Sequence, residues 1–391
     1  MTTTETRLNT KVHDLLERQI AEGRQLGVQV CAYRDGRRIV DTWAGPMGPH
    51  DPRPVGPDTL FNCFSTTKGV AATALHILAD RGLIEYEQPV AKYWPEFAAN
   101  GKGKVTVAQA MSHQAGLHAV PIPFTIDFVS NWQAGLDWIA NGTPAWEPGT
   151  ATGYHAFTYA WVVGGIVQGA SGRHIKDVIA EEIAAPLGVS DEMFVGIPDG
   201  VEDRLSSLKA APLAAGGAAL PPGVQLTPDH DFFKAMPLRS EINFNNMRVR
   251  KACLPSANGH FSARALARMY GALANGGEVD GVRLVSKERI GEMQKVYTSL
   301  PDRVLFRAIP KGVGFMMGGA QAGPDGVPVV GAQGPRISSF GHAGAGGSIA
   351  FADPEAGLSV AVTINLMQNS LQGEGPTLEI CELIRNELGG A

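Results

Sequence analysis

The sequence predicts an α/β (α+β) fold, with an antiparallel sheet flanked by helices and a second, mainly helical domain. The chain starts with the pattern of a helix and two strands, and it ends with the pattern of two strands and a helix. The segment between these ends shows mostly helical patterns and loops. Because both ends can complete one sheet, we expect residues 1–69 and 257–391 to form an α/β sandwich domain and residues 70–256 a mainly helical domain.

The N-terminal elements follow from local patterns. Apolar residues at helical spacing predict a helix over 8–21. Strand-like runs at 28–33 and 39–43 flank Asp35-Gly36, a pair that favours a tight turn between two strands. We therefore expect a helix followed by a β-hairpin.

The middle of the chain predicts helices and one long loop. An apolar, strand-like run at 60–64 precedes good helix formers at 69–79, and a second apolar helix is expected at 161–167. The segment of about 210–255 has little periodicity, as is typical of a lid or a binding loop. Its large apolar residues either pack on the helical domain or wall a substrate pocket and narrow its entrance. They are Phe232, Phe233, Met236, Leu238, Phe244 and Met247.

The C-terminal end predicts two strands and a closing helix. The runs 348–352 and 358–366 are strand-like and are joined by a turn at 353–357. The closing helix has one apolar face, formed by Leu378, Cys381, Ile384 and Leu388.

Composition limits the classes of function. The chain has 391 residues, 44% of them hydrophobic and 18% charged, and a formal net charge of −5. No basic stripe is present to meet phosphates, so we expect no nucleic-acid partner. No apolar run approaches the ~18 residues of a membrane span and no secretory signal is recognisable, so we expect no membrane partner. The four cysteines are scattered, which favours reduced thiols and a cytoplasmic location.

Motifs for metal and nucleotide cofactors are missing from the sequence. It contains no HExxH, no Cys/His quartet, no GxxxxGK[ST], and no GxGxxG after a strand. The GxSxG motif of the α/β-hydrolases is also absent. We therefore expect no metal and no cofactor.

The S-x-x-K motif occurs twice, at Ser65–Lys68 and at Ser206–Lys209. Ser65 opens an apolar helix, so Lys68 is expected on the same helical face among small apolar neighbours. A poorly hydrated lysine can act as the base that takes a serine proton. The second motif runs into a Gly-rich stretch, and we interpret it as a polar loop.

Two further segments could complete a site with Ser65. Tyr154 lies in a Gly-rich loop directly before an apolar helix and can point into a cleft. The segment 341–347 is rich in glycine and precedes a strand, where backbone N–H groups can hold an oxyanion. In isolation, Tyr154 is more typical of a half-buried packing residue, and the glycine-rich segment is more typical of an ordinary turn.

Together, these three segments resemble the serine β-lactamase and penicillin-binding-protein superfamily. Within it, the chain is similar to class C β-lactamases and, more closely, to family VIII carboxylesterases. The resemblance covers nearly the whole chain and implies a serine β-lactamase-like fold. Further similar stretches are 111–117, which is close to the family pattern LLxHxSGL, 154–172, and 256–268.

The resemblance implies roles for individual residues. Ser65 matches the nucleophile, Lys68 the base and Tyr154 the acid/base partner, while the N–H groups of Ser65 and Ala345 match the oxyanion hole. His342, Gly344 and His155 match the substrate-binding positions. Two departures from the β-lactamase pattern stand out. Ala156 replaces the asparagine of the Tyr-x-Asn motif, and His342 replaces the lysine of the Lys-Thr-Gly motif, which meets a substrate carboxylate.

The resemblance therefore implies a serine carboxylesterase that hydrolyses small, short-chain esters through an acyl-enzyme. Alternatives in the same superfamily are a β-lactamase, a D-alanyl-D-alanine peptidase and an acyltransferase. A remote alternative of another class is a non-catalytic binding module that has kept the fold. The expected partner is a small-molecule ester, and the sequence does not predict an oligomeric state.

Overall fold

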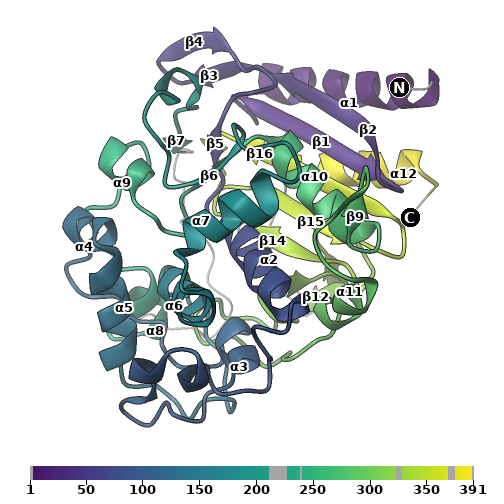
Figure 1. Cartoon of the computed structure of the whole chain (residues 1–391). Helices are drawn as coiled ribbons and strands as arrows, with labels where there is room; N and C mark the ends of the chain where they lie inside the picture. Colours follow the sequence, from purple (N-terminus) through teal and green to yellow (C-terminus); the bar gives the residue numbers. More distant parts are fainter. Residues whose placement is uncertain (1–2, 211–226, 238–239, 323–327, 369–374, 390–391) are drawn as a thin grey trace.

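The computed structural model describes residues 3–210, 227–237, 240–322, 328–368 and 375–389 (Figure 1). Of the predicted loop of about 210–255, residues 211–226 and 238–239 lie outside these ranges, and Leu238 is one of them. No helix in the described ranges is both long and apolar enough to cross a lipid bilayer.

A six-stranded sheet forms the centre of the molecule, with the strand order β11–β14–β15–β16–β1–β2. All neighbouring strands are antiparallel, and β1 pairs with β16 from Val28↔Ile364 to Arg34↔Leu358. This pairing joins the two ends of the chain in one sheet, which confirms the predicted fold class. The strands are β1 (Val28–Arg34), β2 (Arg37–Ala44), β11 (Met316–Met317), β14 (Phe340–Ala343), β15 (Ile349–Asp353) and β16 (Leu358–Ile364).

Helices cover both faces of the sheet, because successive side chains of its strands point to opposite faces and both faces are apolar. On β1, Val28 and Val30 pack with α1 (Thr3–Ala21) and α12 (Pro376–Glu387), whereas Cys31 and Tyr33 face the larger core. Helices α10 (Ala263–Ala274) and α2 (Thr67–Asp80) belong to that larger core. The predicted N-terminal helix, hairpin and C-terminal helix are all present.

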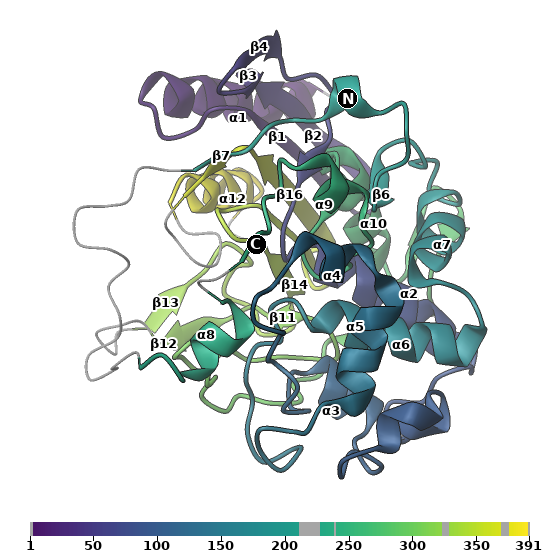
Figure 2. The same cartoon turned by 90° about the vertical axis from the view of Figure 1, so that its left-hand side faces the viewer.

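The middle of the chain is mainly helical. In both views α3, α4, α5 and α6 gather at the end of the molecule away from α1 (Figure 1, Figure 2). The helices are α3 (Val107–Met111), α4 (Ile126–Ser130), α5 (Trp132–Asn141), α6 (Tyr159–Ser171), α7 (Ile175–Ile179), α8 (Asp231–Ala235), α9 (Met247–Lys251) and α11 (Lys287–Met293). Short helical turns lie at Val90–Lys92, Pro95–Ala98, Ala180–Ala184 and Glu202–Arg204.

Small sheets tie the middle of the chain to the central sheet. A three-stranded sheet has the order β5–β8–β6, and β7 pairs in parallel with β17. Further two-stranded pairs are β3 with β4, β9 with β10, and β12 with β13. The bounds are β3 (Pro46–Gly48), β4 (Asp51–Pro54), β5 (Phe61–Asn62), β6 (Met193–Val195), β7 (Lys209–Ala210), β8 (Gly259–Phe261), β9 (Glu278–Val279), β10 (Val282–Arg283), β12 (Ala320–Ala322), β13 (Pro328–Val330) and β17 (Leu366–Met367).

The structure adds two details that periodicity did not show. The expected helical region contributes the strands β6 and β7, and the described part of the 210–255 segment contains the short helices α8 and α9. Elements this short span too few residues to produce a recognisable repeat. The division into two domains at 69/70 and 256/257 stays a prediction. Leu75 of α2 and Ala265 of α10, which lie in different predicted domains, belong to one buried core.

Candidate active site

A tight turn after β5 carries Ser65 to the start of the buried helix α2. Phe64 has a φ of 45°, a left-handed conformation that costs energy for a bulky side chain. The Thr67 hydroxyl supports this turn, because it donates to the Phe64 carbonyl at 2.5 Å and accepts the Gly259 N–H at 2.9 Å. Ser65 itself is only half-buried.

Lys68 lies one helical turn beyond Ser65, and its side chain is fully buried. Its Nζ lies 3.1 Å from Ser65 Oγ, 2.8 Å from the Ala156 carbonyl oxygen and 2.9 Å from the Ser256 carbonyl oxygen. Burial lowers the pKa of this amine well below its usual range, because no water solvates the ammonium form. A neutral amine that donates its two N–H groups to the two carbonyls turns its lone pair toward Ser65 Oγ. This is the arrangement that a general base requires.

Tyr154 completes the cluster from the loop before α6. Its side chain is buried, and its ring centroid lies 4.7 Å from Lys68 Nζ. Burial raises the pKa of the Tyr154 phenol above its usual range, and a hydrogen bond with Ser65 opposes this shift only in part. The phenol therefore keeps its proton at neutral pH and can donate it. The structure thus brings Ser65, Lys68 and Tyr154 together.

An apolar pocket of about 190 Å³ lies beside the three side chains. Its wall combines the Ser65 turn, the Tyr154 loop, the turn after β14 and residues from the 210–255 segment. The lining residues are Phe64, Ser65, Tyr154, Ala156, Phe157, Met236, Phe244, Ala257, Leu305, Arg307, Met316, Ala343, Gly344 and Ala345. Ser65 is therefore at a cavity that can hold a small apolar group.

The turn between β14 and β15 packs directly against the Ser65 turn. The Gly344 N–H donates to the Ser348 carbonyl at 2.7 Å, and the Ser348 hydroxyl donates to the Cys63 carbonyl at 2.9 Å. In the part of the chain that the structure describes, no protein acceptor receives the N–H of Ser65 or of Ala345. Both residues line the pocket, as does Gly344. Two unused N–H groups at one pocket are what an oxyanion hole requires, although this role stays a prediction.

The two histidines that we expected to bind substrate do not reach the pocket wall. The His342 ring is buried behind Tyr154, with the two ring centroids 6.0 Å apart, and its Nδ1 lies 2.8 Å from the Ala343 carbonyl oxygen. His155 accepts the Leu117 N–H at 3.0 Å, and its other ring nitrogen lies 2.7 Å from the Gly153 carbonyl. Burial lowers the pKa of both imidazoles to about 3, so both are neutral. Neither histidine is among the residues that line the pocket, and their assignment to substrate binding stays a prediction.

The 210–255 segment contributes to the pocket. Met236 and Phe244 line it, and Phe232 packs behind the wall in the cluster that contains Tyr154. Met247 instead packs on a separate apolar cluster that contains Leu60. Met236 and Phe244 therefore fit the interpretation of this segment as a pocket wall, whereas Met247 fits the interpretation as ordinary packing.

The second S-x-x-K motif forms no comparable cluster. Ser206 is buried, contrary to the expected polar loop: its hydroxyl donates to the Met47 carbonyl at 2.8 Å and accepts from Asn365 Nδ2 at 3.0 Å. Lys209 is exposed on the short strand β7. The lysine therefore lacks the burial that lowers the pKa of Lys68.

Several site residues carry no recognisable signal in the sequence. Leu305, Arg307 and Met316 line the pocket, yet no sequence motif marks any of them. Asp302 accepts the backbone N–H of Tyr154 at 3.0 Å from 148 positions away. Contacts at such separations depend on the tertiary fold.

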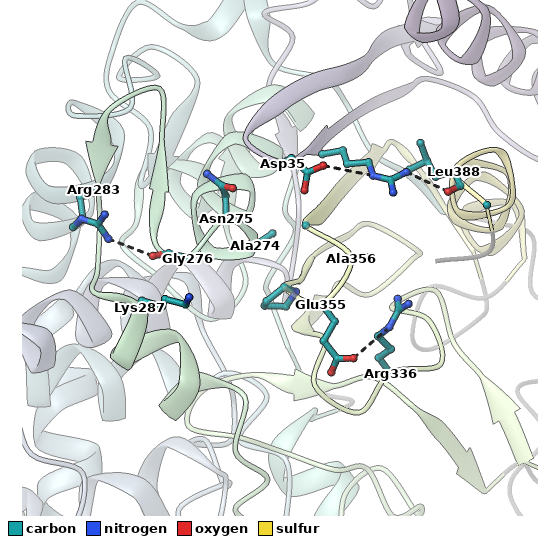
Figure 3. Close-up of a pocket in the computed structure, with 14 residues that line it drawn as sticks. Asp35, Ala274, Asn275, Gly276, Arg283, Lys287, Arg336, Glu355, Ala356 and Leu388 are labelled. Atoms are coloured by element: carbon teal, nitrogen blue, oxygen red, sulfur yellow. Dashed lines mark hydrogen bonds and ion pairs between the residues drawn. The ribbon is translucent and has the colours of Figure 1, made fainter.

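A larger pocket of about 820 Å³ lies elsewhere, at the hairpin turns of the central sheet (Figure 3). Several of its charged side chains have protein partners: Arg336 lies 3.5 Å from Glu355, and Arg283 donates to the Gly276 carbonyl at 3.3 Å. None of the described residues that line it carries a hydroxyl, a thiol or an imidazole. It therefore offers no serine-type chemistry.

Comparisons with known proteins agree with this geometry. A family model described as Beta-lactamase matches residues 12–380. The esterase/beta-lactamase LipL of Mycobacterium tuberculosis is 36% identical over 357 residues, which are 89% of this chain and 79% of LipL. The crystal structure of a family VIII carboxylesterase matches with a TM-score of 0.86 and 32% identity over 97% of both chains. A penicillin-binding protein homologue from Caulobacter crescentus matches with a TM-score of 0.85 and 35% identity, also over 97% of both chains.

The fold is thus that of the serine β-lactamases and penicillin-binding proteins, and the site is of the esterase/β-lactamase class of hydrolases. The chain belongs to the β-lactamase family. The resemblance to this family that the motifs indicated is confirmed.

Gly344 gives a first test of how the site is built. A Cβ at this position would lie 2.3 Å from both the Cys63 carbonyl oxygen and Ser348 Oγ, so Gly344→Ala must displace the Ser65 turn. We expect kcat/KM for p-nitrophenyl acetate to fall by about 10- to 100-fold in a folded protein. The matched control is Gly291→Ala, where a Cβ meets nothing within 4 Å. Equal activity of the two variants would contradict this account.

Proposed function

We propose that the protein is a serine carboxylesterase that hydrolyses small, short-chain esters through an acyl-enzyme. The observation that carries this proposal is the position of Ser65 Oγ, 3.1 Å from a buried Lys68 amine and at an apolar pocket of about 190 Å³. The similarity to a family VIII carboxylesterase and to LipL supports the same activity.

In the proposed acylation, neutral Lys68 takes the Ser65 proton while Oγ attacks the ester carbonyl carbon. The N–H groups of Ser65 and Ala345 stabilise the negative oxygen of the tetrahedral intermediate. When the bond to the alcohol breaks, Tyr154 gives its proton to the leaving oxygen and regains one from the Lys68 ammonium. The alcohol departs, and the acyl group stays on Ser65.

In the proposed deacylation, water replaces the alcohol in the reverse sequence. As water attacks the acyl carbonyl, Tyr154 takes a proton from it and passes its own proton to neutral Lys68, and Ser65 Oγ leaves with the proton that Lys68 returns. The net change is ester plus water to acid plus alcohol. Every proton moves between the substrate, water and the side chains of Ser65, Lys68 and Tyr154, so the proposed mechanism requires no metal or cofactor.

The pocket supports a short, uncharged acyl group as the preferred substrate. Its wall is mainly apolar, and position 342, where β-lactamases have a cationic lysine, holds a buried neutral histidine. β-Lactam hydrolysis is a second candidate, which Arg307 favours because it brings a positive charge to the pocket wall. We also propose a cytoplasmic location, since all four cysteines are free and three are buried.

Replacing the nucleophile tests the central claim. We expect Ser65→Ala to reduce hydrolysis of p-nitrophenyl acetate at least about 1,000-fold, because it removes the hydroxyl that lies 3.1 Å from Lys68 Nζ and forms the acyl-enzyme. The control is Ser206→Ala, which removes the serine of the second motif and should keep the activity. Nitrocefin is assayed in parallel, and turnover of nitrocefin far faster than of any ester would favour the β-lactamase alternative.

The pKa shift of Lys68 predicts a pH profile. The reaction needs neutral Lys68, so kcat/KM should rise with pH as the ammonium loses its proton. Because burial lowers the pKa of Lys68, this rise should be complete well below the pH at which an exposed lysine titrates, and the raised pKa of Tyr154 should extend the plateau upward. Acid release by pH-stat measures the profile. Lys68→Arg cannot supply a neutral base and should lose about 100-fold or more; retained activity would contradict the assigned role.

Phe244 tests how the wall limits the acyl chain. Phe244→Ala removes a ring from the pocket wall, so the kcat/KM ratio of octanoyl to acetyl p-nitrophenyl esters should rise about tenfold or more, since each newly buried methylene contributes ~0.8 kcal/mol. Phe233→Ala is the control, because Phe233 lies in the same segment but does not line the pocket. An unchanged ratio in Phe244→Ala would show that this ring does not set chain length.

A further inference from the structure

A buried carboxylate lies behind the proposed acid/base loop. The side chain of Asp302 has no exposed surface, and it is not among the side chains that line the pocket. One of its oxygens, Oδ1, accepts three backbone N–H groups, from Tyr154 at 3.0 Å and from Val304 and Leu305 at 2.9 Å each. A single oxygen therefore joins the loop that carries Tyr154 to the loop that carries Leu305 into the pocket wall.

The second oxygen of Asp302 pairs with a buried lysine. Lys311 Nζ lies 3.0 Å from Asp302 Oδ2, and the lysine side chain is only 1% exposed. The backbone of Lys311 exchanges hydrogen bonds with Thr298 and forms a bridge with Met316, another residue of the pocket wall. The ion pair therefore connects a third segment of the site to the same carboxylate.

The backbone around this carboxylate has one further link to the Tyr154 loop. The Arg303 N–H donates to the Thr152 carbonyl at 2.9 Å, two residues before Tyr154. The N–H group of Tyr154 itself donates to the Asp302 carboxylate. The direction of the Tyr154 side chain depends on its main chain, so this hydrogen bond bears on where the phenol points.

A buried ion pair is a poor source of stability, because the cost of removing two charges from water offsets much of their attraction. A carboxylate that accepts several backbone N–H groups does, however, fix the relative position of the segments that supply them. The geometry of Asp302 therefore suits positioning better than it suits general stabilisation.

Building on the proposed function, we propose that Asp302, paired with Lys311, is a positioning residue. It fixes the positions of the Tyr154 phenol and of Leu305 in the pocket wall relative to Ser65. Asp302 touches neither the pocket nor Ser65, so it acts only through the main chain that it holds. Its loss should slow acylation, because a displacement of about 1 Å in a reacting group can cost about 100-fold in rate.

Three variants separate the hydrogen bonds from the charges. Asp302→Asn/Lys311→Met keeps an acceptor at Oδ1 and removes both charges together, so we expect kcat for p-nitrophenyl acetate within about threefold of wild type. Asp302→Ala/Lys311→Met removes the acceptor as well and should lower kcat by about 10- to 100-fold, with KM for this small ester changed less than threefold. Asp302→Glu keeps the pair but displaces the acceptor by one methylene, and it should lose kcat even if the alanine variant does not fold.

The values of kcat and KM are measured from the steady-state release of p-nitrophenolate, and the burst phase gives the acylation rate. All rates are expressed per active site titrated with a serine-reactive phosphonate. The matched control is Asp353→Ala/Arg336→Met, which removes another buried carboxylate that accepts a backbone N–H and pairs with an arginine, away from this pocket. It should lower the melting temperature and leave kcat per active site unchanged.

Two results would overturn the positioning role: wild-type kcat in the alanine or glutamate variant, or equal losses in the asparagine and alanine variants. Ser65→Ala, assayed alongside, tests the proposed function separately. Full activity in Ser65→Ala would overturn the esterase proposal, whereas an inactive Ser65→Ala with an unaffected Asp302→Ala/Lys311→Met would overturn the positioning role alone.

Discussion

The burial of one lysine amine is the constraint on which the rest of the site depends. Lys68 Nζ is in contact with three oxygens from three distant parts of the chain, namely Ser65 Oγ and the carbonyls of Ala156 and Ser256. A lysine at this depth is tolerated only because two carbonyls replace the water that it has lost. The helix that carries it is buried along almost its entire length, so the surrounding helices and the sheet must be in place before the amine has its unusual basicity.

The fold supplies those surroundings through one small sheet and one glycine turn. The pairing of β5 with β8 brings the residues before Ser65 beside Gly259, near Ser256, and the Thr67 hydroxyl bonds to both sides of this junction. The turn at Gly344 then packs directly against the Ser65 turn, and the Ser348 hydroxyl donates to the Cys63 carbonyl across this contact. A strained backbone at Phe64, a buried amine at Lys68 and close packing at Gly344 thus occur within one small region, as is common where function outweighs local stability.

Sequence patterns predicted the parts of the molecule that depend on neighbours along the chain. The terminal helices and the hairpin have clear periods, and Ser65, Lys68 and Tyr154 lie in motifs that a family resemblance could connect. The patterns did not give the direction of His342 and His155, because a histidine next to a motif can face the pocket or the core with the same spacing. Asp302 had no signal at all, because its carboxylate meets Tyr154 across 148 residues.

The place of β1 in the sheet has a consequence for synthesis on the ribosome. One of its neighbours in the sheet interior is β16, and the adjoining hydrogen bond from Gly27 to Asn365 spans 338 residues. Until the last segments leave the ribosome, β1 has one unpaired side and its apolar residues lack the cover of α12. The nascent N-terminal hairpin is therefore a natural client for chaperones, and a chain cut short before β16 would expose an open, apolar strand edge to its neighbours.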